Sequence, residues 1–316
     1  MPVYNGERHL KEAISSILNQ TFSDFEFLII NDGSTDQSEK IINSYNDDRI
    51  RYLNNEGNKG LIFTLNRGIE MAEGKYIARM DQDDISFEDR LKEQYDFLEE
   101  NLDIALVGGW AEIINESGEK IGNYKTPVNH YEIKFDLLFH NPFVHGTIFF
   151  RKNIVKELGG YNEKDKYAED YGLYSTAIQN YKMANLPEFL IRYRIHNSSI
   201  GQAPQTKTIQ DETAKKISFN NINRYIDIDR DDFTKYYEVL NNRNSNFRDF
   251  LKYLKINKNI YNRFIKKEKL DKEQVKNIYH MYTSKNRAII KNRYKFIYRL
   301  FKKINPVRDM ATDMLR

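Results

Sequence analysis

Helix-like and strand-like hydrophobic patterns alternate along the first part of the chain. Apolar residues recur at helical spacing in some segments and form short continuous runs in the segments between them. The expected helices are 7–20, 61–72 and 87–98, and the expected strands are 25–30, 49–53, 75–80 and 104–114. Ser34 or Thr35 can cap a further helix that carries Ile41, Ile42 and Tyr45. Such alternation predicts an α/β fold in which helices cover both faces of a mostly parallel sheet.

Polar residues stand at the ends of two of these strands. Asn31 and Asp32 follow the strand at 25–30, and Asp81 and Asp83 follow the strand at 75–80. In open α/β sheets, ligands bind in the crevice beyond the carboxyl ends of the strands. These residues are therefore the first candidates for a functional site.

The segment Asp81-Gln82-Asp83-Asp84 holds three carboxylates in four positions. Such carboxylates repel one another unless a cation or strong hydrogen-bond donors compensate them. Mg²⁺ and Mn²⁺ suit these oxygen ligands, and water and substrate phosphates usually complete their coordination. The alternative is an acidic loop that caps the next helix, whose first turn holds Glu88 and Asp89.

A second pair of motifs lies upstream: Pro2-Val3-Tyr4-Asn5-Gly6-Glu7 and Asn31-Asp32-Gly33-Ser34-Thr35-Asp36. Asp32 can accept hydrogen bonds from a base or a ribose, and Gly33 allows a sharp turn beside it. The alternative is an ordinary turn that leads into a helix.

Five segments in one order, PVYNGE, FLIINDGSTD, NKGLIFTLNRGI, GKYIARMDQDD and YAEDYGLY, resemble the bacterial glycosyltransferase family two. The resemblance spans residues 2–200. It implies the type A nucleotide-sugar fold, an inverting reaction and a nucleotide-sugar donor, with uracil as the usual base. An ordered match of five segments is more specific than any one of them.

On this resemblance, the opening motifs bind the nucleotide. Pro2, Tyr4 and Asp32 correspond to residues at the nucleobase, and Glu7 lies in the same motif. Asn58 belongs to the stretch between the base pocket and the acidic motif.

The resemblance also implies a metal and diphosphate site. Asp81 corresponds to a residue that binds the nucleotide diphosphate, and Asp83 to a direct ligand of Mn²⁺ or Mg²⁺. Arg194 and His196 match a closing motif whose basic residues face the diphosphate or the metal, so Arg194 is a nucleotide candidate and His196 a metal candidate.

The acidic pair Glu169-Asp170 resembles the family's catalytic base motif. Inversion requires a carboxylate that takes the acceptor's proton on the face opposite the leaving diphosphate, and Asp170 is the expected base. Glu169 and His145 are candidates for the acceptor side. The alternatives are that the pair begins a helix and that the histidine is structural.

The chain departs from the family's pattern at two positions. Relatives have several apolar residues before PVYN, whereas here Met1 alone precedes Pro2, so the first strand is expected to be cut short. Asn31 stands where relatives have an aspartate, which keeps a hydrogen-bonding side chain but removes a charge.

Charge divides the chain near residue 206. The net charge of +3 is made of about −11 in residues 1–206 and about +14 in residues 207–316. We therefore expect a catalytic domain over 1–205 and a basic helical region over 206–316. Within the latter, 289–304 has the pattern of a basic amphipathic helix, which favours either contact with an anionic membrane or packing inside the protein.

The absence of cysteine excludes disulfides and thiolate metal sites, and no apolar run reaches the ~20 residues of a membrane span. The expected location is the cytoplasm or the inner face of the cell membrane, without nucleic-acid binding.

The predicted function is a metal-dependent glycosyltransferase of hexosyl or N-acetylhexosaminyl type. It would move a sugar from a UDP-sugar to a hydroxyl of a cell-surface polysaccharide or lipid-linked glycan. The alternatives are a nucleotidyltransferase and a non-catalytic glycan-binding or scaffold relative. A nucleotidyltransferase would usually carry a glycine-rich basic loop near its start, which PVYNGERHL is not.

Overall fold

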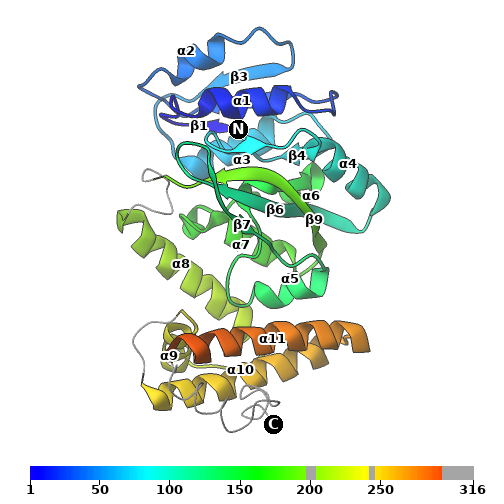
Figure 1. The fold of residues 1–316 in the computed structure, drawn as a ribbon, viewed down its shortest axis with the longest axis vertical. Coiled ribbons are helices and arrows are strands. Elements are labelled where there is room, and N and C mark those ends of the chain that lie inside the picture. Colours follow the sequence, from blue (N-terminus) through cyan, green and yellow to red (C-terminus); the bar gives the residue numbers. More distant parts are fainter. Residues whose placement is uncertain (197–203, 242–245, 294–316) are drawn as a thin grey trace. The chain divides into compact units, whose positions relative to one another are not determined.

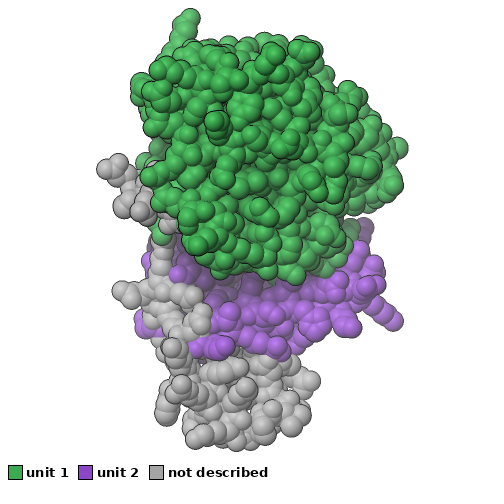
Figure 2. Space-filling view, turned by 45° about the horizontal axis from the view of Figure 1, so that its top comes forward, with its two compact units in different colours: residues 1–214 green, residues 215–316 purple. Residues whose placement is uncertain are grey.

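The computed structural model of the chain describes residues 1–196, 204–241 and 246–293 (Figure 1). It divides into two compact units, Met1–Ala214 and Lys215–Arg316 (Figure 2). The division falls within helix α8 (Pro204–Asn223), and the predicted boundary at residues 205 and 206 lies near the start of that helix.

A parallel three-stranded sheet begins unit 1. Its order is β1 (Pro2–Val3), β2 (Phe27–Asn31) and β3 (Ile50–Asn54). Helix α1 (Leu10–Leu18) packs on it because its apolar side chains recur on one face and join the apolar core around Val3, Phe27 and Ile29. The expected short first strand is confirmed, and its two residues still pair with Ile30 and Asn31.

A mixed sheet forms the rest of unit 1. Its strands follow the order β4 (Tyr76–Ala78), β8 (Phe149–Arg151), β6 (Ile104–Ile114), β9 (Lys182–Arg194) and β5 (Ile85–Ser86), and β7 (Lys120–Tyr124) pairs with β6. Strands β6 and β9 run side by side in parallel (Figure 1), and the other pairs are antiparallel. The predicted α/β fold with a parallel sheet is confirmed.

The other helices of unit 1 are α2 (Ser38–Asn43), α3 (Leu61–Met71), α4 (Arg90–Glu100), α5 (His130–Asp136), α6 (Lys152–Glu157) and α7 (Glu169–Ala177), with short 3-10 turns at His145–Thr147 and Glu163–Asp165. The prediction that Ser34 or Thr35 caps α2 is wrong. Asp36 Oδ1 instead accepts a hydrogen bond from the Ser38 N–H at 2.9 Å. Ser34 is engaged elsewhere, because its hydroxyl accepts from the Asn5 N–H at 3.0 Å.

Unit 2 contains the end of α8 together with α9 (Arg230–Leu240), α10 (Phe247–Glu268) and α11 (Lys272–Arg293). Its core is rich in tyrosine: the rings of Tyr236 and Tyr253 stack at 5.0 Å, and the Tyr236 hydroxyl donates to Asn257 Oδ1 at 3.1 Å. The helical C-terminal region is therefore confirmed.

The basic amphipathic segment predicted at 289–304 lies mostly outside the described residues, which end at Arg293. Its first apolar residue, Ile289, is buried in α11. None of the described helices is both long and apolar enough to cross a membrane.

Candidate functional site

The loops that follow β1 and β2 are joined by reciprocal hydrogen bonds. Glu7 Oε2 accepts from the Gln37 N–H at 2.9 Å, and the Glu7 N–H donates to Asp36 Oδ2 at 3.0 Å. Asn5 Oδ1 accepts from the Thr35 N–H at 2.8 Å. Glu7 thus holds two loops together, and its predicted contact with a nucleotide stays a prediction.

Asp32 stands at the carboxyl end of β2 and fixes the next loop. Its Oδ1 accepts from Asn55 Nδ2 at 2.6 Å and from the Lys59 N–H at 2.9 Å, and its Oδ2 accepts from the Gly60 N–H at 2.8 Å. A carboxylate has about four lone-pair positions, so these bonds leave room for a further donor. The predicted base contact of Asp32 remains open.

The surface around Asp32 carries the other predicted nucleotide residues. Tyr4 is 44% exposed, Asn58 is exposed, and Pro2 is half-buried in β1. Gly33 has φ +73°, and a Cβ at this residue would lie 2.5 Å from the Gly57 carbonyl carbon. Glycine at this position therefore allows the loop of Asn58 to pack against the end of β2.

Gln82 links this nucleotide region to the acidic segment. Its Oε1 accepts from the Tyr4 N–H at 2.9 Å, and its Nε2 donates to the Tyr4 carbonyl at 3.1 Å. The sequence predicts no role for Gln82. Its partner lies in the opening loop, and nothing in the local pattern points to it.

The carboxylates of the acidic segment have different partners. Asp81 forms an ion pair with the buried Arg79. Asp83 Oδ2 lies 2.8 Å from His196 Nε2. The structure therefore brings together the two predicted metal ligands, although they are far apart in the sequence.

The donor set at Asp83 and His196 fits a divalent metal ion that substrate phosphates complete. Carboxylate oxygen and imidazole nitrogen are both suitable for Mn²⁺, and Mg²⁺ is commonly bound by one or two carboxylates plus phosphates. Among the described residues, no group of three or more histidine, aspartate or glutamate side chains is placed to hold a metal. A metal ion at this position would have Asp83 and His196 as its protein ligands, and the donor would supply the rest.

Arg194 is buried under the acidic segment, with 1% of its side chain exposed. Its guanidinium donates to the Asp83 carbonyl at 2.9 Å, to the Glu116 carbonyl at 3.0 Å and to Glu12 Oε2 at 2.7 Å. Its N–H donates to Asp84 Oδ1 at 2.9 Å. The predicted contact between Arg194 and a nucleotide stays a prediction, because in this structure its donors are used within the chain.

Asp84 is the buried carboxyl of the acidic segment. Burial and the neighbouring Asp83 charge raise the pKa of Asp84 to about 7. Among the described residues its Oδ2 has no hydrogen-bond partner. Asp84 is therefore largely protonated in the folded protein at a pH at which an unfolded aspartate is ionised.

This shift predicts that stability falls with rising pH. The folded pKa exceeds the unfolded value, so the contribution of Asp84 is present below about pH 4 and is lost as the pH rises through about 7. Between about pH 5.5 and about pH 8, we expect the free energy of unfolding of the parent to fall by about 2 kcal/mol more than that of Asp84→Asn. Urea unfolding in EDTA measures both slopes, and equal slopes would contradict this role of Asp84.

The predicted catalytic pair lies at the start of α7. Asp170 Oδ2 accepts from Asn141 Nδ2 at 2.7 Å, and Oδ1 accepts from the Tyr171 N–H at 2.7 Å. Burial raises the pKa of Asp170, and Arg79 partly offsets the rise. Burial and the Asp170 charge raise the pKa of Glu169 to about 7.

His145 begins the short 3-10 turn His145–Thr147, beside the acidic segment. Its Nε2 is 2.9 Å from the Tyr161 hydroxyl, and burial lowers the pKa of His145 well below its usual range, so the ring is neutral at pH 7. A Cβ at the adjacent Gly146 would lie 2.8 Å from Asp84 Oδ2, which shows how closely this turn packs on the acidic segment. The predicted acceptor contact of His145 remains a prediction.

Several residues of the site escaped the sequence analysis: Arg79, Gln82, Asn141, Glu12 and His9, whose ring lies 5.5 Å from that of His196. Arg79 and Gln82 lie within the segment GKYIARMDQDD, next to the aspartates, and this position was the available signal for them. Asn141, Glu12 and His9 lie outside the quoted segments and act through partners that are distant in the sequence.

Comparison with known proteins identifies the family. Residues 1–159 match the model of glycosyl transferase family 2. An uncharacterized glycosyltransferase of Haemophilus influenzae is 38% identical over 234 residues, which cover 71% of this chain and 72% of that protein. The O-antigen biosynthesis glycosyltransferase WbnJ of Escherichia coli is 38% identical over 209 residues, 63% of this chain and 79% of that protein.

The fold is shared with solved structures. The crystal structure of S. aureus TarS 1-349 aligns with a TM-score of 0.56 at 17% identity, over 93% of this chain and 89% of that chain. The fold is therefore that of the type A glycosyltransferases. From the family match and the identity to its relatives, the chain belongs to glycosyl transferase family 2 and is a glycosyltransferase.

Proposed function

We propose that this glycosyltransferase moves a sugar from a UDP-sugar to a hydroxyl of a surface polysaccharide or lipid-linked glycan, with inversion at the anomeric carbon and with a divalent metal. The choice of UDP rests on the family resemblance, and TarS has been solved in complex with UDP. The choice of acceptor follows the O-antigen function in the name of WbnJ. The requirement for a metal rests on the pairing of Asp83 with His196.

The observation that carries the proposal is the position of Arg79. This buried guanidinium forms an ion pair with Asp81, and its charge also acts on Glu169 and Asp170, whose pKa values it lowers against the larger effect of burial. That one buried charge acts on both supports a shared site for the acidic segment and the pair on α7. A donor diphosphate and an acceptor hydroxyl can be held there together.

In the proposed reaction, Asp170 takes the proton of the acceptor hydroxyl. The acceptor oxygen forms the new bond to the anomeric carbon, the bond to the diphosphate breaks, and its electron pair leaves with the nucleotide. Asn141 and Tyr171 hold the carboxylate in position, and its raised pKa makes it a stronger base.

Asp83 and His196 would hold the metal ion, which would supply positive charge beside the departing diphosphate. Arg194 keeps the backbone at Asp83 in place. Gln82 ties the opening loop to the same segment, so base recognition and diphosphate binding depend on a common support.

Calorimetric titration with UDP tests the proposal. We expect UDP to bind at least about tenfold more tightly with Mn²⁺ than in EDTA, and we expect this gain to be absent from the double variant Asp81→Ala, Asp83→Ala. Asp103→Ala is the matched control, because it removes a carboxylate that is 61% exposed and paired with a surface lysine.

Equal affinity with and without metal, or an unchanged gain in the double variant, would contradict the proposed metal site. If the first test succeeds, hydrolysis of individual UDP-sugars then identifies the donor. The anomeric configuration of the product, read by proton NMR, tests inversion.

A further inference from the structure

Tyr193 stands on β9 between Arg192 and Arg194, and the site described above does not use it. Successive side chains of a strand point to opposite faces, so Tyr193 and Ile191 share one face and the two arginines share the other. On its own face, Tyr193 packs against an apolar cluster that contains Ile191 and Val144. The phenol ring is therefore held in place by apolar neighbours, and its side chain is only half-buried.

The face of β9 that carries Tyr193 borders the acidic segment. A Cβ at Gly146 would lie 2.9 Å from Ile191 Cδ1 and 2.8 Å from Asp84 Oδ2, so Ile191 reaches the surroundings of this carboxyl. One residue beyond Tyr193, the Arg194 N–H donates to Asp84 Oδ1 at 2.9 Å. The strand is thus held against the acidic segment on both sides of Tyr193.

The other neighbour of Tyr193 is the loop that holds the expected base. Val144, which packs with Tyr193, follows Asn141 by three residues. Asn141 Nδ2 donates to Asp170 Oδ2 at 2.7 Å. Tyr193 therefore lies between the acidic segment, which carries Asp83, and the loop that positions Asp170.

The electrostatic surroundings of the Tyr193 hydroxyl agree with this position. Burial raises the pKa of Tyr193 to about 12, with further contributions from the charges of Asp84, Asp83 and Asp170. Among the described residues, no group forms a hydrogen bond with this hydroxyl. Tyr193 thus presents a phenol that keeps its proton at neutral pH and can donate a hydrogen bond to a ligand.

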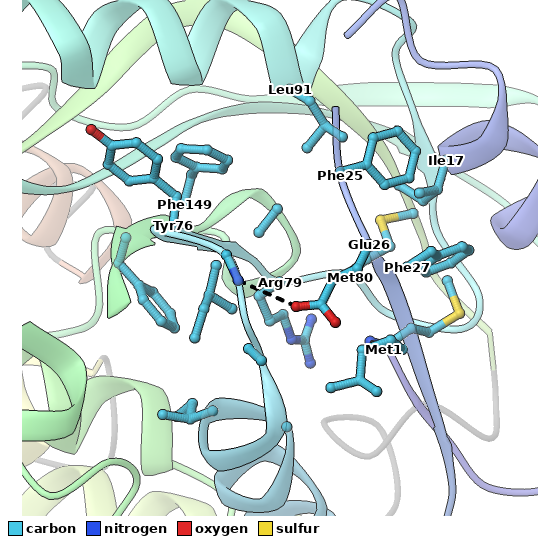
Figure 3. A pocket seen from close by; sticks show the side chains of 18 of the residues that line it. Met1, Ile17, Phe25, Glu26, Phe27, Tyr76, Arg79, Met80, Leu91 and Phe149 are labelled. Carbon is cyan, nitrogen blue, oxygen red and sulfur yellow. Dashed lines mark hydrogen bonds between the residues drawn. The ribbon is translucent and has the colours of Figure 1, made fainter. Parts of the chain in front are cut away.

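This position is distinct from the large cavity inside unit 1, whose volume is about 570 Å³ (Figure 3). Arg79 is part of the lining of that cavity, whereas Tyr193, Asp83 and Asp170 are not. A ligand beside Tyr193 would therefore lie in the candidate active site and not in the cavity.

We propose that the Tyr193 hydroxyl donates a hydrogen bond to a hydroxyl or acetamido oxygen of the sugar that is transferred, and so helps to select the donor. This inference rests on the proposed function, in which the sugar leaves a diphosphate beside Asp83 and an oxygen that Asp170 deprotonates attacks it. In an inverting displacement, the leaving group and the attacking oxygen lie on opposite faces of the sugar. The sugar then occupies the space between these two carboxylates, which Tyr193 borders.

Tyr193→Phe tests the proposal, because it removes the hydroxyl and keeps the ring that packs on Val144. The donors are UDP-glucose, UDP-galactose, UDP-N-acetylglucosamine and UDP-N-acetylgalactosamine, followed by monodeoxy analogues of the one that the parent hydrolyses fastest with Mn²⁺. Tyr181→Phe is the matched control, since the Tyr181 hydroxyl donates to Glu157 Oε1 at 2.6 Å at the end of β9 opposite Tyr193. Hydrolysis kinetics, UDP calorimetry and thermal unfolding are measured for each protein.

We expect Tyr193→Phe to lower kcat/KM for the best donor about tenfold, the scale of one hydrogen bond. UDP affinity with Mn²⁺ should stay within about twofold of the parent, and Tm within about 2 °C. One monodeoxy analogue should lose about tenfold in the parent but less than about twofold in the variant, because its partner is already gone. Tyr181→Phe should match the parent in every measurement.

Equal losses in the parent and in Tyr193→Phe for every monodeoxy analogue would overturn the proposal, and so would full donor hydrolysis by the variant. A joint loss of UDP affinity and Tm would show a structural role and would overturn it as well. Absence of donor hydrolysis by the parent would contradict the proposed function, and this inference with it. The inference fails alone when the parent is active and the variant behaves in the same way.

Discussion

Asp170→Asn is expected to lower kcat about a thousandfold, because a positioned general base contributes roughly 10²–10⁴-fold to a proton transfer. UDP binding in the presence of Mn²⁺ should stay within about twofold of the parent. Turnover is measured with the UDP-sugar that the parent hydrolyses fastest, and UDP binding by calorimetry.

The substitution separates chemistry from structure. Asparagine keeps the shape of the side chain and can still accept from the Tyr171 N–H, which donates to Asp170 at 2.7 Å. It cannot take up the acceptor's proton. A fall in kcat without a change in UDP affinity is therefore the signature of a base, whereas a loss of both would indicate a structural role.

Glu169→Gln is the matched control for this experiment. Glu169 is adjacent and buried, and its pKa is raised to about 7, but its carboxylate is not the expected base. We expect a much smaller loss of kcat from it. Full turnover by Asp170→Asn, or a larger loss in Glu169→Gln, would assign the base to the other residue.

The pH dependence follows from the same environment. Burial raises the pKa of Asp170, so the base is protonated and inactive over a wider acidic range than an ordinary aspartate. The kcat of the parent should therefore rise with pH through a pKa above the usual range of aspartate. That limb of the profile should be missing from the residual activity of Asp170→Asn.

The sequence predicts most of the elements of unit 1, because hydrophobic periodicity is a local property. The helix expected at 61–72 is observed at Leu61–Met71, and the extended run at 104–114 is observed at Ile104–Ile114. Asp32 and Asp81 could be selected because each lies within two residues of the end of an expected strand. The antiparallel pairing of β4 with β8 could not be predicted, since it depends on contacts between distant segments.

The sequence pattern could not predict which side chains of the site are buried. Arg192 and Arg194 stand two positions apart on β9, so strand periodicity places them on the same face. Nevertheless, the Arg192 side chain is 47% exposed, whereas the Arg194 side chain is only 1% exposed. The difference arises from the Asp83 and Glu116 backbone groups that surround Arg194, which lie far from it in the sequence.

Arg194→Met is expected to lower the free energy of unfolding by about 3 kcal/mol, because it leaves buried acceptors without their charged donor. The carbonyls of Asp83 and Glu116 both lose a hydrogen bond. Glu12 loses its partner as well, but its side chain is 59% exposed and can be solvated, so it adds little to the cost. Urea unfolding gives the change in stability.

Arg192→Met is the control, since it makes the same substitution on the same strand at an exposed side chain. We expect it to change stability by less than about 0.5 kcal/mol. In Arg194→Met we also expect UDP affinity with Mn²⁺ to fall about tenfold, because the backbone that carries Asp83 loses its support. Weaker UDP binding with unchanged stability would instead show that Arg194 contacts the diphosphate directly. Equal stability of Arg194→Met and Arg192→Met would contradict the supporting role of Arg194. A loss of both stability and UDP affinity in Arg194→Met would mean that the metal site depends on a cation buried beneath it.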